Sequence, residues 1–322
     1  MNIHFLCTED YMTRERAGLK KALDTHCSLS FLDCFPNTAE GVKSSFDGES
    51  WPDLAIAPDI HKTYLPEGVE ELPFPTACFH IDAYSATGNR SNMSRLFDLV
   101  LVFHPYSIKD YSRSHPDVRS FPHAIPREAY QNNFRSKVYD VSMIGRLDGK
   151  DYKYRRAVVN SLSSMDLSTN EMRCYYPYHK MIETYSKSKI TVNVSRGKHL
   201  DLAHLSCIEI MGSGTLLLTT SDPDKNRPHE LTKLGFEKDK HFDTFGSIEE
   251  MRQKIRRYLN QDKQRKEIAE ASRAKVLADH TCSQRAACLT NWVQEGIHLQ
   301  APARSMKEGE VASIYVDYFS KR

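Results

Sequence analysis

Short apolar segments alternate with helix-like segments along the chain, and this alternation limits its fold more than any other feature. Strands that are apolar on both faces and separated by helices are typical of parallel sheets with both faces covered. The pattern therefore predicts a doubly wound α/β fold up to about Pro126. The expected strands of this part are Ile3–Cys7, Leu29–Asp33, Asp53–Ala57, Thr76–Ile81 and Asp98–Phe103.

The same alternation restarts after residue 137. Apolar positions at helical spacing predict helices between the new strands, and Ser247 with Glu250 forms the pattern of a capping box. We therefore expect two Rossmann-like domains, over residues 1–130 and 138–295. The second set of expected strands is Tyr139–Ile144, Lys189–Val194 and Thr215–Thr220. The expected helices are Tyr152–Leu162, Tyr178–Ser188, about His204–Met211, a helix after Ser247, and a long helix from Asp262 to about Ala278.

The C-terminal tail, residues 296–322, has its own periodicity. Apolar side chains recur at intervals of three and four residues, which predicts an amphipathic helix that needs a surface to pack on. We expect it to pack back on the N-terminal domain, and a partner surface is the alternative. The apolar positions are Val311, Ile314, Tyr315, Tyr318 and Phe319.

Composition excludes several classes. Of 322 residues, 44 are Lys or Arg and 42 are Asp or Glu, so the net charge of +2 lacks the strong basic excess of a nucleic-acid-binding domain. With 40% hydrophobic residues the chain is not disordered as a whole. Its most apolar stretch, Leu96–Phe103, is interrupted by Asp98 and is far shorter than the roughly 20 residues that span a bilayer. The N-terminus has no signal-peptide pattern, and eight cysteines without a Cys-x-x-Cys pair indicate reduced thiols, so we expect a cytoplasmic protein.

An acidic pair precedes a glycine break and a buried strand in the second half. Asp201 is expected in a loop and Glu209 inside the following helix, before Gly212 and Gly214. Loops at the carboxyl ends of parallel strands bind nucleotides, and a carboxylate there can accept both hydroxyls of a ribose. The alternative for Glu209 is a solvated helix residue.

The second half of the chain contains, in order, Gly145-Arg146 after a strand, Tyr185–Val194, Ile208–Thr219, His241–Met251 and Asp279–Arg285. These segments together resemble the donor domain of GT-B glycosyltransferases, and in particular the group related to glycosyltransferase family 4 and spore maturation CgeB-like proteins. The resemblance covers residues 138–292 well and the N-terminal half loosely. It implies a GT-B fold, in which two Rossmann-like doubly wound domains face a central cleft. It also implies transfer of a sugar from a nucleotide sugar to a hydroxyl acceptor.

The resemblance assigns a donor-binding set. It implies that Glu209 binds the ribose, that Asp201 faces the donor sugar, and that Arg146 binds the diphosphate. Cations beside a diphosphate stabilise it as it leaves, so no metal is expected, and no cofactor beyond a UDP- or GDP-linked sugar. The alternative for Arg146 is a surface residue of a strand loop. The remaining members of the set are Gly145, Lys150 and Arg196, with Arg155 as a further cation.

On the acceptor side, the resemblance points to the end of a strand in the first domain. His80 or Asp82 would position the acceptor, or take its proton in an inverting enzyme. A retaining enzyme, which family 4 implies, needs no dedicated base because the departing phosphate can accept the proton. The alternative for His80 is a core histidine. The acceptor itself is left open among a glycan, a protein and a nucleic-acid base.

Two other interpretations remain. A non-catalytic carbohydrate- or nucleotide-binding module is favoured by departures from the family pattern, such as Asp201 where Glu is usual and Ser206 where Arg is frequent. Asp222-Pro-Asp224 has the form of a metal–nucleotide motif of another glycosyltransferase class, but the segment order of that class does not surround it. We therefore expect no metal site.

Overall fold

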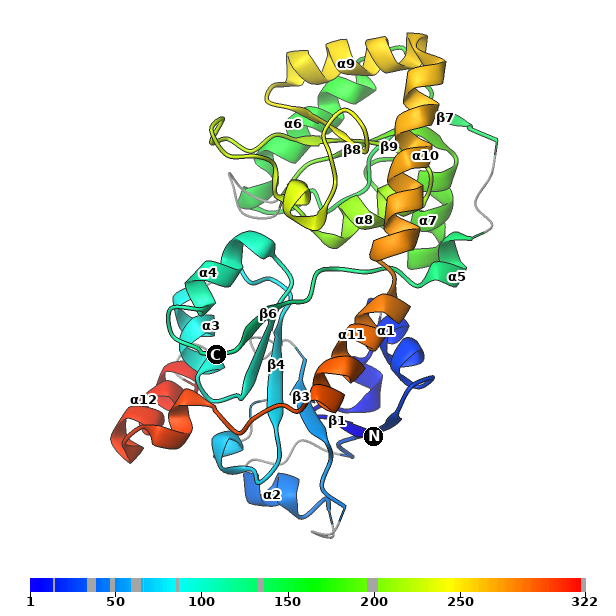
Figure 1. Cartoon of the computed structure of the whole chain (residues 1–322). Coiled ribbons are helices and arrows are strands. Elements are labelled where there is room, and N and C mark those ends of the chain that lie inside the picture. The colour runs from blue at the N-terminus through cyan, green and yellow to red at the C-terminus, as the bar shows by residue number, and fades with distance from the viewer. Residues whose placement is uncertain are drawn as a thin grey trace. The chain divides into compact units, whose positions relative to one another are not determined.

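The computed structural model describes all residues except 14, 34–38, 47–49, 59–64, 66, 85–86, 132–135, 196–201 and 320–322. The chain divides into two compact units (Figure 1). Unit 1 contains Met1–Pro122 and Ser283–Arg322, and unit 2 contains His123–Cys282. No helix in the described part of the chain is both long and apolar enough to cross a membrane.

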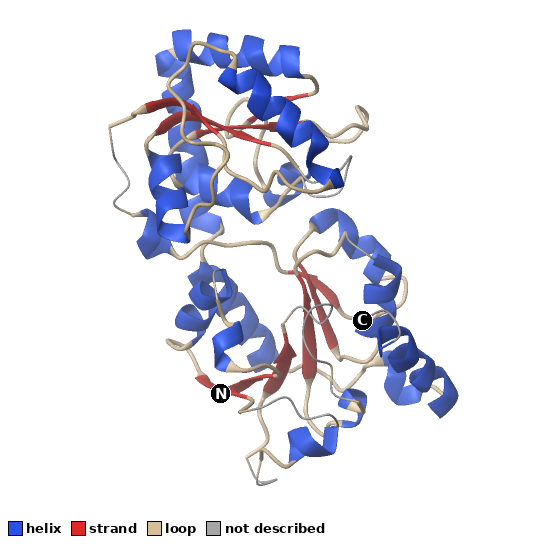
Figure 2. Cartoon of the chain, turned by 180° about the vertical axis from the view of Figure 1, so that it is seen from behind, coloured by secondary structure: helices blue, strands red, loops and turns tan. Residues whose placement is uncertain are grey.

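Unit 1 is built on a parallel sheet of six strands in the order β2-β1-β3-β4-β5-β6. Its strands are β1 (Asn2–Phe5), β2 (Ser28–Phe31), β3 (Leu54–Ala57), β4 (Thr76–His80), β5 (Leu99–Val102) and β6 (Val118–Ser120). Alternate residues of one strand enter opposite cores: Leu54 and Ile56 face one, Ala55 and Ala57 the other. Both faces are therefore buried, as Figure 2 shows by helices on each side of the sheet.

The helices of unit 1 divide between these two cores. Helices α1 (Glu15–Leu23) and α11 (Cys282–Glu295) contribute to one of them. The other core receives α2 (Ala39–Lys43), α3 (Thr87–Ser94), α4 (Ile108–Tyr111) and α12 (Glu308–Phe319). Short 3-10 helices complete the unit: η1 (Glu9–Tyr11), η2 (Val69–Glu71), η3 (Pro105–Ser107) and η6 (Pro302–Ser305).

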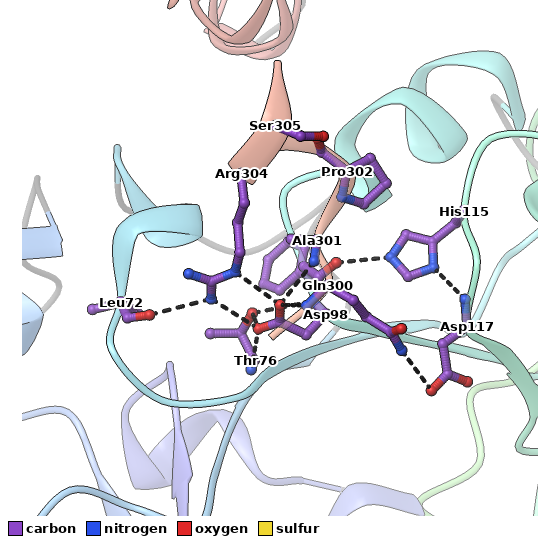
Figure 3. A network of polar contacts seen from close by, with 11 residues as sticks. Leu72, Thr76, Asp98, His115, Asp117, Gln300, Ala301, Pro302, Arg304 and Ser305 are labelled. Atoms are coloured by element: carbon purple, nitrogen blue, oxygen red, sulfur yellow. Dashed lines mark hydrogen bonds and ion pairs between the residues drawn. The ribbon is translucent and has the colours of Figure 1, made fainter. Parts of the chain in front are cut away.

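A buried carboxylate fixes the C-terminal segment to unit 1 (Figure 3). Asp98 is fully buried at the start of β5 and accepts hydrogen bonds from the backbone N–H groups of Gln300 and Ala301 at 2.7 and 2.8 Å. Arg304 donates to both of its carboxylate oxygens at 2.9 and 3.0 Å, and Thr76 donates two further bonds. The fully hydrogen-bonded ion pair offsets the desolvation of the charge and holds the chain against the sheet.

Helix α12 then packs on the same unit. Ile314, Tyr315 and Tyr318 are buried in its core, so the expected amphipathic helix is present. The Tyr315 hydroxyl donates to the Glu70 carboxylate at 2.6 Å and accepts from the N–H of Gly68 at 2.8 Å.

Unit 2 has a parallel sheet of four strands in the order β10-β9-β8-β7. Its strands are β7 (Tyr139–Ser142), β8 (Ser188–Asn193), β9 (Leu216–Thr220) and β10 (Asp243–Phe245). Helices α6 (Lys153–Ser163) and α9 (Ile248–Asn260) contribute to one core, and α7 (Tyr178–Ser186) and α8 (Leu205–Gly212) to the other. The unit also holds α5 (Arg127–Tyr130), the long α10 (Asp262–Asp279), η4 (Lys150–Tyr152) and η5 (Glu230–Leu234).

The fold confirms the doubly wound interpretation and each strand expected from the apolar pattern. Ser247 caps α9 as expected: its hydroxyl accepts from the N–H of Glu250 at 3.1 Å. The reciprocal bond of the capping box is shifted by one residue, because the Glu250 carboxylate accepts from the N–H of Gly246 at 2.8 Å. Asp262 begins α10 but does not cap it, because Gln261 is the capping residue and the Asp262 carboxylate pairs with Arg265.

The unit boundaries differ from the expected ranges 1–130, 138–295 and 296–322 at two places. Ile125 and Tyr130 pack in a core of unit 2, so the chain changes unit at residue 122. Ala286 and Leu289 of α11 pack in a core of unit 1, so this helix belongs with the N-terminal strands and not with residues 138–282. The local sequence pattern does not indicate which unit covers these side chains, because that depends on contacts between residues far apart in the sequence.

Candidate functional site

The carboxyl ends of the strands of unit 2 define one edge of its sheet. In a parallel sheet these ends meet at the same edge, where the loops that follow each strand lie next to one another. Here the loop after β7 leads into η4 and α6, the segment after β8 leads into α8, and the loop after β9 leads towards η5. These loops carry most of the residues expected to bind a nucleotide sugar.

The loop after β7 is held in place by a buried asparagine. The Asn170 side chain, only 4% exposed, accepts a hydrogen bond from the N–H of Met143 at 3.0 Å and donates to its carbonyl at 3.1 Å. Tyr176 accepts a further bond from the same amide at 3.0 Å. Asn170 thereby fixes the direction in which the chain leaves the strand. Its position, far along the chain from β7, gave no signal in the sequence.

Arg155 joins this loop to the next one. Its guanidinium donates to the carbonyl of Arg146 at 3.0 Å and to the carbonyl of Val194, just after β8, at 2.5 Å. A Cβ atom on Gly145 would lie 2.9 Å from a terminal nitrogen of this guanidinium, closer than ordinary packing allows. Gly145 therefore has a packing reason to be glycine, and Arg155 positions the loops, whereas the sequence suggested only a second cation.

Arg146 projects from the same loop into solvent, with 66% of its side chain exposed. It makes two hydrogen bonds of 2.8 Å to the Asp148 carboxylate, and these bonds lower the pKa of Asp148 below its ordinary value. The guanidinium also lies 5.8 Å from the ring centre of Tyr152. An exposed ion pair of this kind contributes little to folding, so the guanidinium can exchange Asp148 for a more highly charged ligand at small cost. Lys150 is exposed at the start of η4, four residues along the chain.

Glu209 lies in α8 and is only 2% exposed. The interpretation as a solvated helix residue is therefore wrong. Burial raises the pKa of Tyr130 and of Tyr185 well above the usual range, and the charge of Glu209 raises both further. The carboxylate thus belongs to a polar group inside the helical layer, with two buried phenols near it.

The start of α8 is also fixed by polar contacts. Asn193 ends β8, and its side chain contacts His204, the N-cap residue of the helix, at 3.0 Å and donates to Thr219 at 3.0 Å. The buried Glu230 carboxylate accepts from the N–H of Ala203 at 3.3 Å. Glu230 is a residue of this edge that the sequence patterns did not reveal. Asp201 and Arg196 fall outside the described residues.

In the loop after β9, the acidic residues of Asp222-Pro-Asp224 make contacts within the loop itself. Asp222 is buried, pairs with Arg227 at 2.7 Å, and accepts from the N–H of Asp224 at 3.0 Å. The described residues contain no group of three or more His, Cys, Asp or Glu side chains that could hold a metal ion.

In unit 1 the expected acceptor residues lie in different surroundings. His80, the last residue of β4, is fully buried, with its Nε2 atom 2.6 Å from the Ser94 hydroxyl and its ring 4.7 Å from that of Tyr111. This burial favours the core-histidine alternative. Asp82, two residues further along, is half-buried.

Comparison with known proteins agrees with this architecture. Residues 135–291 match the family described as glycosyl transferase-like. A glycosyltransferase from Rickettsia africae superposes on this chain with a TM-score of 0.68 at 10% sequence identity. The superposition covers 91% of this chain and 97% of the Rickettsia protein. Its fold is shared over nearly the full length of both proteins. The chain has the GT-B fold.

Two further solved structures have this fold. The HepE protein of Anabaena, solved with UDP and glucose, gives a TM-score of 0.64 at 11% identity and covers 92% of this chain and 100% of its own. An alpha-glucosyltransferase solved with UDP-glucose and DNA gives 0.59 at 11% identity, covering 91% of this chain and 98% of its own. No curated protein matches the sequence. The chain thus has a GT-B fold, and its match to the glycosyl transferase-like family lies mostly in unit 2.

Proposed function

We propose that this protein is a glycosyltransferase of the group related to family 4 and CgeB-like proteins, and that it transfers a sugar from a UDP-linked donor to a hydroxyl acceptor. One observation carries the proposal: the glycosyl transferase-like match falls on the unit whose carboxyl-edge loops present Gly145, Arg146 and the start of α8. The choice of UDP over GDP is supported by the similar structures that were solved with UDP or UDP-glucose.

In this proposal the diphosphate lies against the loop after β7. Arg146 exchanges its bond to Asp148 for the phosphate oxygens, and Lys150 adds a second positive charge. The N-terminus of α8 adds its partial positive charge at the same edge. Glu209 accepts the ribose hydroxyls, while Asp201 and Arg196 contact the donor sugar and the phosphates. Because protein cations offset the charge of the leaving group, transfer proceeds without a metal ion.

The reaction breaks the bond between the anomeric carbon and the phosphate oxygen and forms one from that carbon to the acceptor oxygen. The acceptor proton passes to the departing phosphate, and configuration is retained. The contact of the His80 Nε2 atom with the Ser94 hydroxyl at 2.6 Å supports this route, because a general base must reach the proton it removes. His80 then supports the acceptor side from within the core of unit 1, and the half-buried Asp82 is the candidate for acceptor contact. The buried thiols of Cys7, Cys78 and Cys207 support our proposal that the protein works in the cytoplasm.

The decisive experiment measures binding and turnover together. Isothermal titration of the full chain with UDP, GDP, ADP and CDP, with and without Mg²⁺, is expected to select UDP and to show no need for the metal. Glu209→Gln should weaken UDP binding and leave the binding of pyrophosphate, which has no ribose, unchanged. Equal weakening of both ligands would remove the ribose assignment.

Hydrolysis of UDP-glucose without acceptor separates an enzyme from a binding module. Slow release of glucose, abolished in Arg146→Ala, is expected from an enzyme. Tight UDP binding with no release from any UDP-sugar would favour the non-catalytic module. Acceptor screening should include glycans, proteins and DNA, the last because one similar structure was solved with DNA.

A further inference from the structure

A cavity of unit 2 lies at the edge of its sheet opposite the carboxyl-end loops, where the strands begin. Its volume is about 410 Å³. Lys137 stands just before β7, Lys189 is the second residue of β8, and Gly214 comes just before β9. The amino ends of parallel strands lie at the edge opposite their carboxyl ends, so this cavity is separated from the proposed donor site by the length of the sheet. None of the described residues that line this cavity belongs to the proposed donor site.

One face of α10 forms the wall of the cavity. Arg265, Ala269 and Arg273 follow each other at intervals of four residues, and Lys266 and Glu270 follow the same interval beside them. Residues four apart lie on one side of a helix, so these side chains project together. Figure 1 shows α10 running past α8 and β9.

Gly214 forms part of the floor. It has a positive φ of 68°, and a Cβ atom there would lie 3.2 Å from the side chain of Arg273. The glycine therefore lets the backbone turn at the end of α8 and lets the Arg273 side chain approach it closely.

Positive charge dominates the lining. Among the described residues that line the cavity, five side chains are cationic and one, Glu270, is a carboxylate. Two more carboxylates pair with the cations from outside the lining: Asp140 with Lys189 at 2.7 Å, and Asp262 with both Arg265 and Lys266. The five cations and three carboxylates leave an excess of two positive charges. Such an excess over a cavity of this size fits a small dianion.

Lys137 is the cation whose surroundings point most directly to an anionic ligand. Its ammonium group donates to the carbonyls of Ser186 and Gly214, both at 2.9 Å, and to the Thr215 hydroxyl at 3.3 Å. These three acceptors are neutral. Desolvation and, to a smaller degree, the nearby charge of Arg265 lower the pKa of Lys137 to about 8. The positive charge of Lys137 is thus held in place with little compensating negative charge, and an anion in the cavity would supply that negative charge.

We propose that this cavity binds the phosphate group of a small phosphorylated molecule. Lys137, Lys266 and Arg273 surround the phosphate, and the remaining volume accommodates an attached group about the size of one sugar ring. The binding is separate from that of the nucleotide sugar and does not depend on the proposed activity.

The test is titration of the full chain carrying Arg146→Ala, which weakens the donor site, with inorganic phosphate, pyrophosphate and glucose 6-phosphate. A stoichiometry of one is expected for the ligand that fits. Tighter binding of glucose 6-phosphate than of the inorganic anions would identify an organic phosphate as the occupant, and the reverse order would identify a free inorganic anion.

Matched substitutions on α10 decide where the anion binds. Lys266→Gln removes a cation that lines the cavity, whereas Lys263→Gln removes a 92% exposed lysine of the same helix that does not. The first should weaken binding by about threefold and the second should leave it unchanged, because a single exposed charge at a distance is screened. Lys137→Gln should weaken binding by about tenfold or more. Equal effects of Lys266→Gln and Lys263→Gln, or no saturable binding of any of the three anions, would overturn the proposal.

Discussion

Two polar side chains at or just beyond strand ends, His80 and Arg146, differ in their exposure to solvent. His80 ends β4 in unit 1 and is fully buried, whereas Arg146 follows β7 in unit 2 and has 66% of its side chain exposed. His80 still pairs with Val102 in the sheet, so its side chain must enter the layer between sheet and helices. Arg146 lies four residues beyond the last strand residue, Ser142, where no neighbouring strand constrains it. A polar residue within the paired strand therefore serves packing here, and the residues beyond it are accessible to a ligand.

The largest expected effect is that of replacing the exposed Arg146. Arg146→Ala should lower turnover about 10²–10³-fold, the usual loss when one group that stabilises a leaving oxyanion is removed. The melting temperature of this variant should equal that of the unchanged protein, because Arg146 is exposed and its ion pair with Asp148 contributes little to stability. Steady-state kinetics and thermal melting of the same preparation measure both. Arg113→Ala, in another exposed Arg–Asp pair, is the matched control and should leave turnover intact. A similar loss in both variants would contradict a specific role for Arg146.

Replacing the buried His80 should lower the stability of the protein and leave turnover nearly unchanged. His80→Ala removes the contact with Ser94 and leaves a hole next to Tyr111, so the free energy of unfolding should fall by about 2 kcal/mol. Turnover below the melting transition should change by less than about threefold, which is the small effect expected of a packing residue. Ser94→Ala should reproduce the loss of stability in part. A catalytic His80 would instead give a large loss of turnover that Ser94→Ala does not share.

Buried histidines in both units should make the fold sensitive to acid. Burial lowers the pKa of His4 in unit 1 and of His229 in unit 2 to about 4, from an ordinary value of 6.5. Between these values the unfolded chain binds more protons than the folded one, so stability is complete above pH 6.5 and falls as the pH drops towards 4. Each histidine should remove about 1–2 kcal/mol by pH 5. Urea unfolding at pH 7 and pH 5 measures the fall, and His4→Gln should reduce it. A pH-independent free energy of unfolding would show that these imidazoles are not held neutral.

The smallest effect tests how tightly the exposed loop is built. Gly145→Ala places a methyl group against the Arg155 guanidinium, which bonds two loop carbonyls, so UDP affinity should fall by a few-fold as the loop shifts. Gly88→Ala is the matched control, because a Cβ atom there would meet no neighbour within 4 Å. Unchanged UDP affinity in Gly145→Ala would mean that the loop tolerates displacement and is not preorganised for the diphosphate.

The periodicity of apolar residues predicted the strands and most of the helices, because buried parallel strands and amphipathic helices leave a local signature. It did not predict β6 or β10. Val118–Ser120 contains a single apolar residue and pairs only at the edge of its sheet, and Asp243–Phe245 is a three-residue strand at the edge of the other sheet. The sequence analysis also placed residues 282–295 in the second domain, whereas Ala286 and Leu289 of α11 pack in unit 1. Which surface an apolar face covers depends on contacts between distant residues, and these leave no mark in a local pattern.

The candidate site was predictable to a similar degree. The glycine, the arginine and the acidic helix residue follow from the order of segments, and the structure puts the loop that carries Gly145 and Arg146 at one edge of one sheet with the start of α8. The residues that hold this edge, Asn170 and Glu230, act on backbone groups far away in the sequence. Their roles depend on the fold as a whole. The burial of His80 likewise depends on α3 and α4, which supply Ser94 and Tyr111.

Hydrogen–deuterium exchange with and without UDP tests most directly whether the nucleotide binds at the carboxyl edge of unit 2. Protection of the loop over residues 143–150 and of the first turn of α8 is expected, reduced in Arg146→Ala. Unit 1 and the amino-edge cavity around Lys137 should exchange as in the free protein. Protection confined to β4 and its neighbours, or none at a UDP concentration shown by titration to saturate the protein, would contradict a donor site in unit 2.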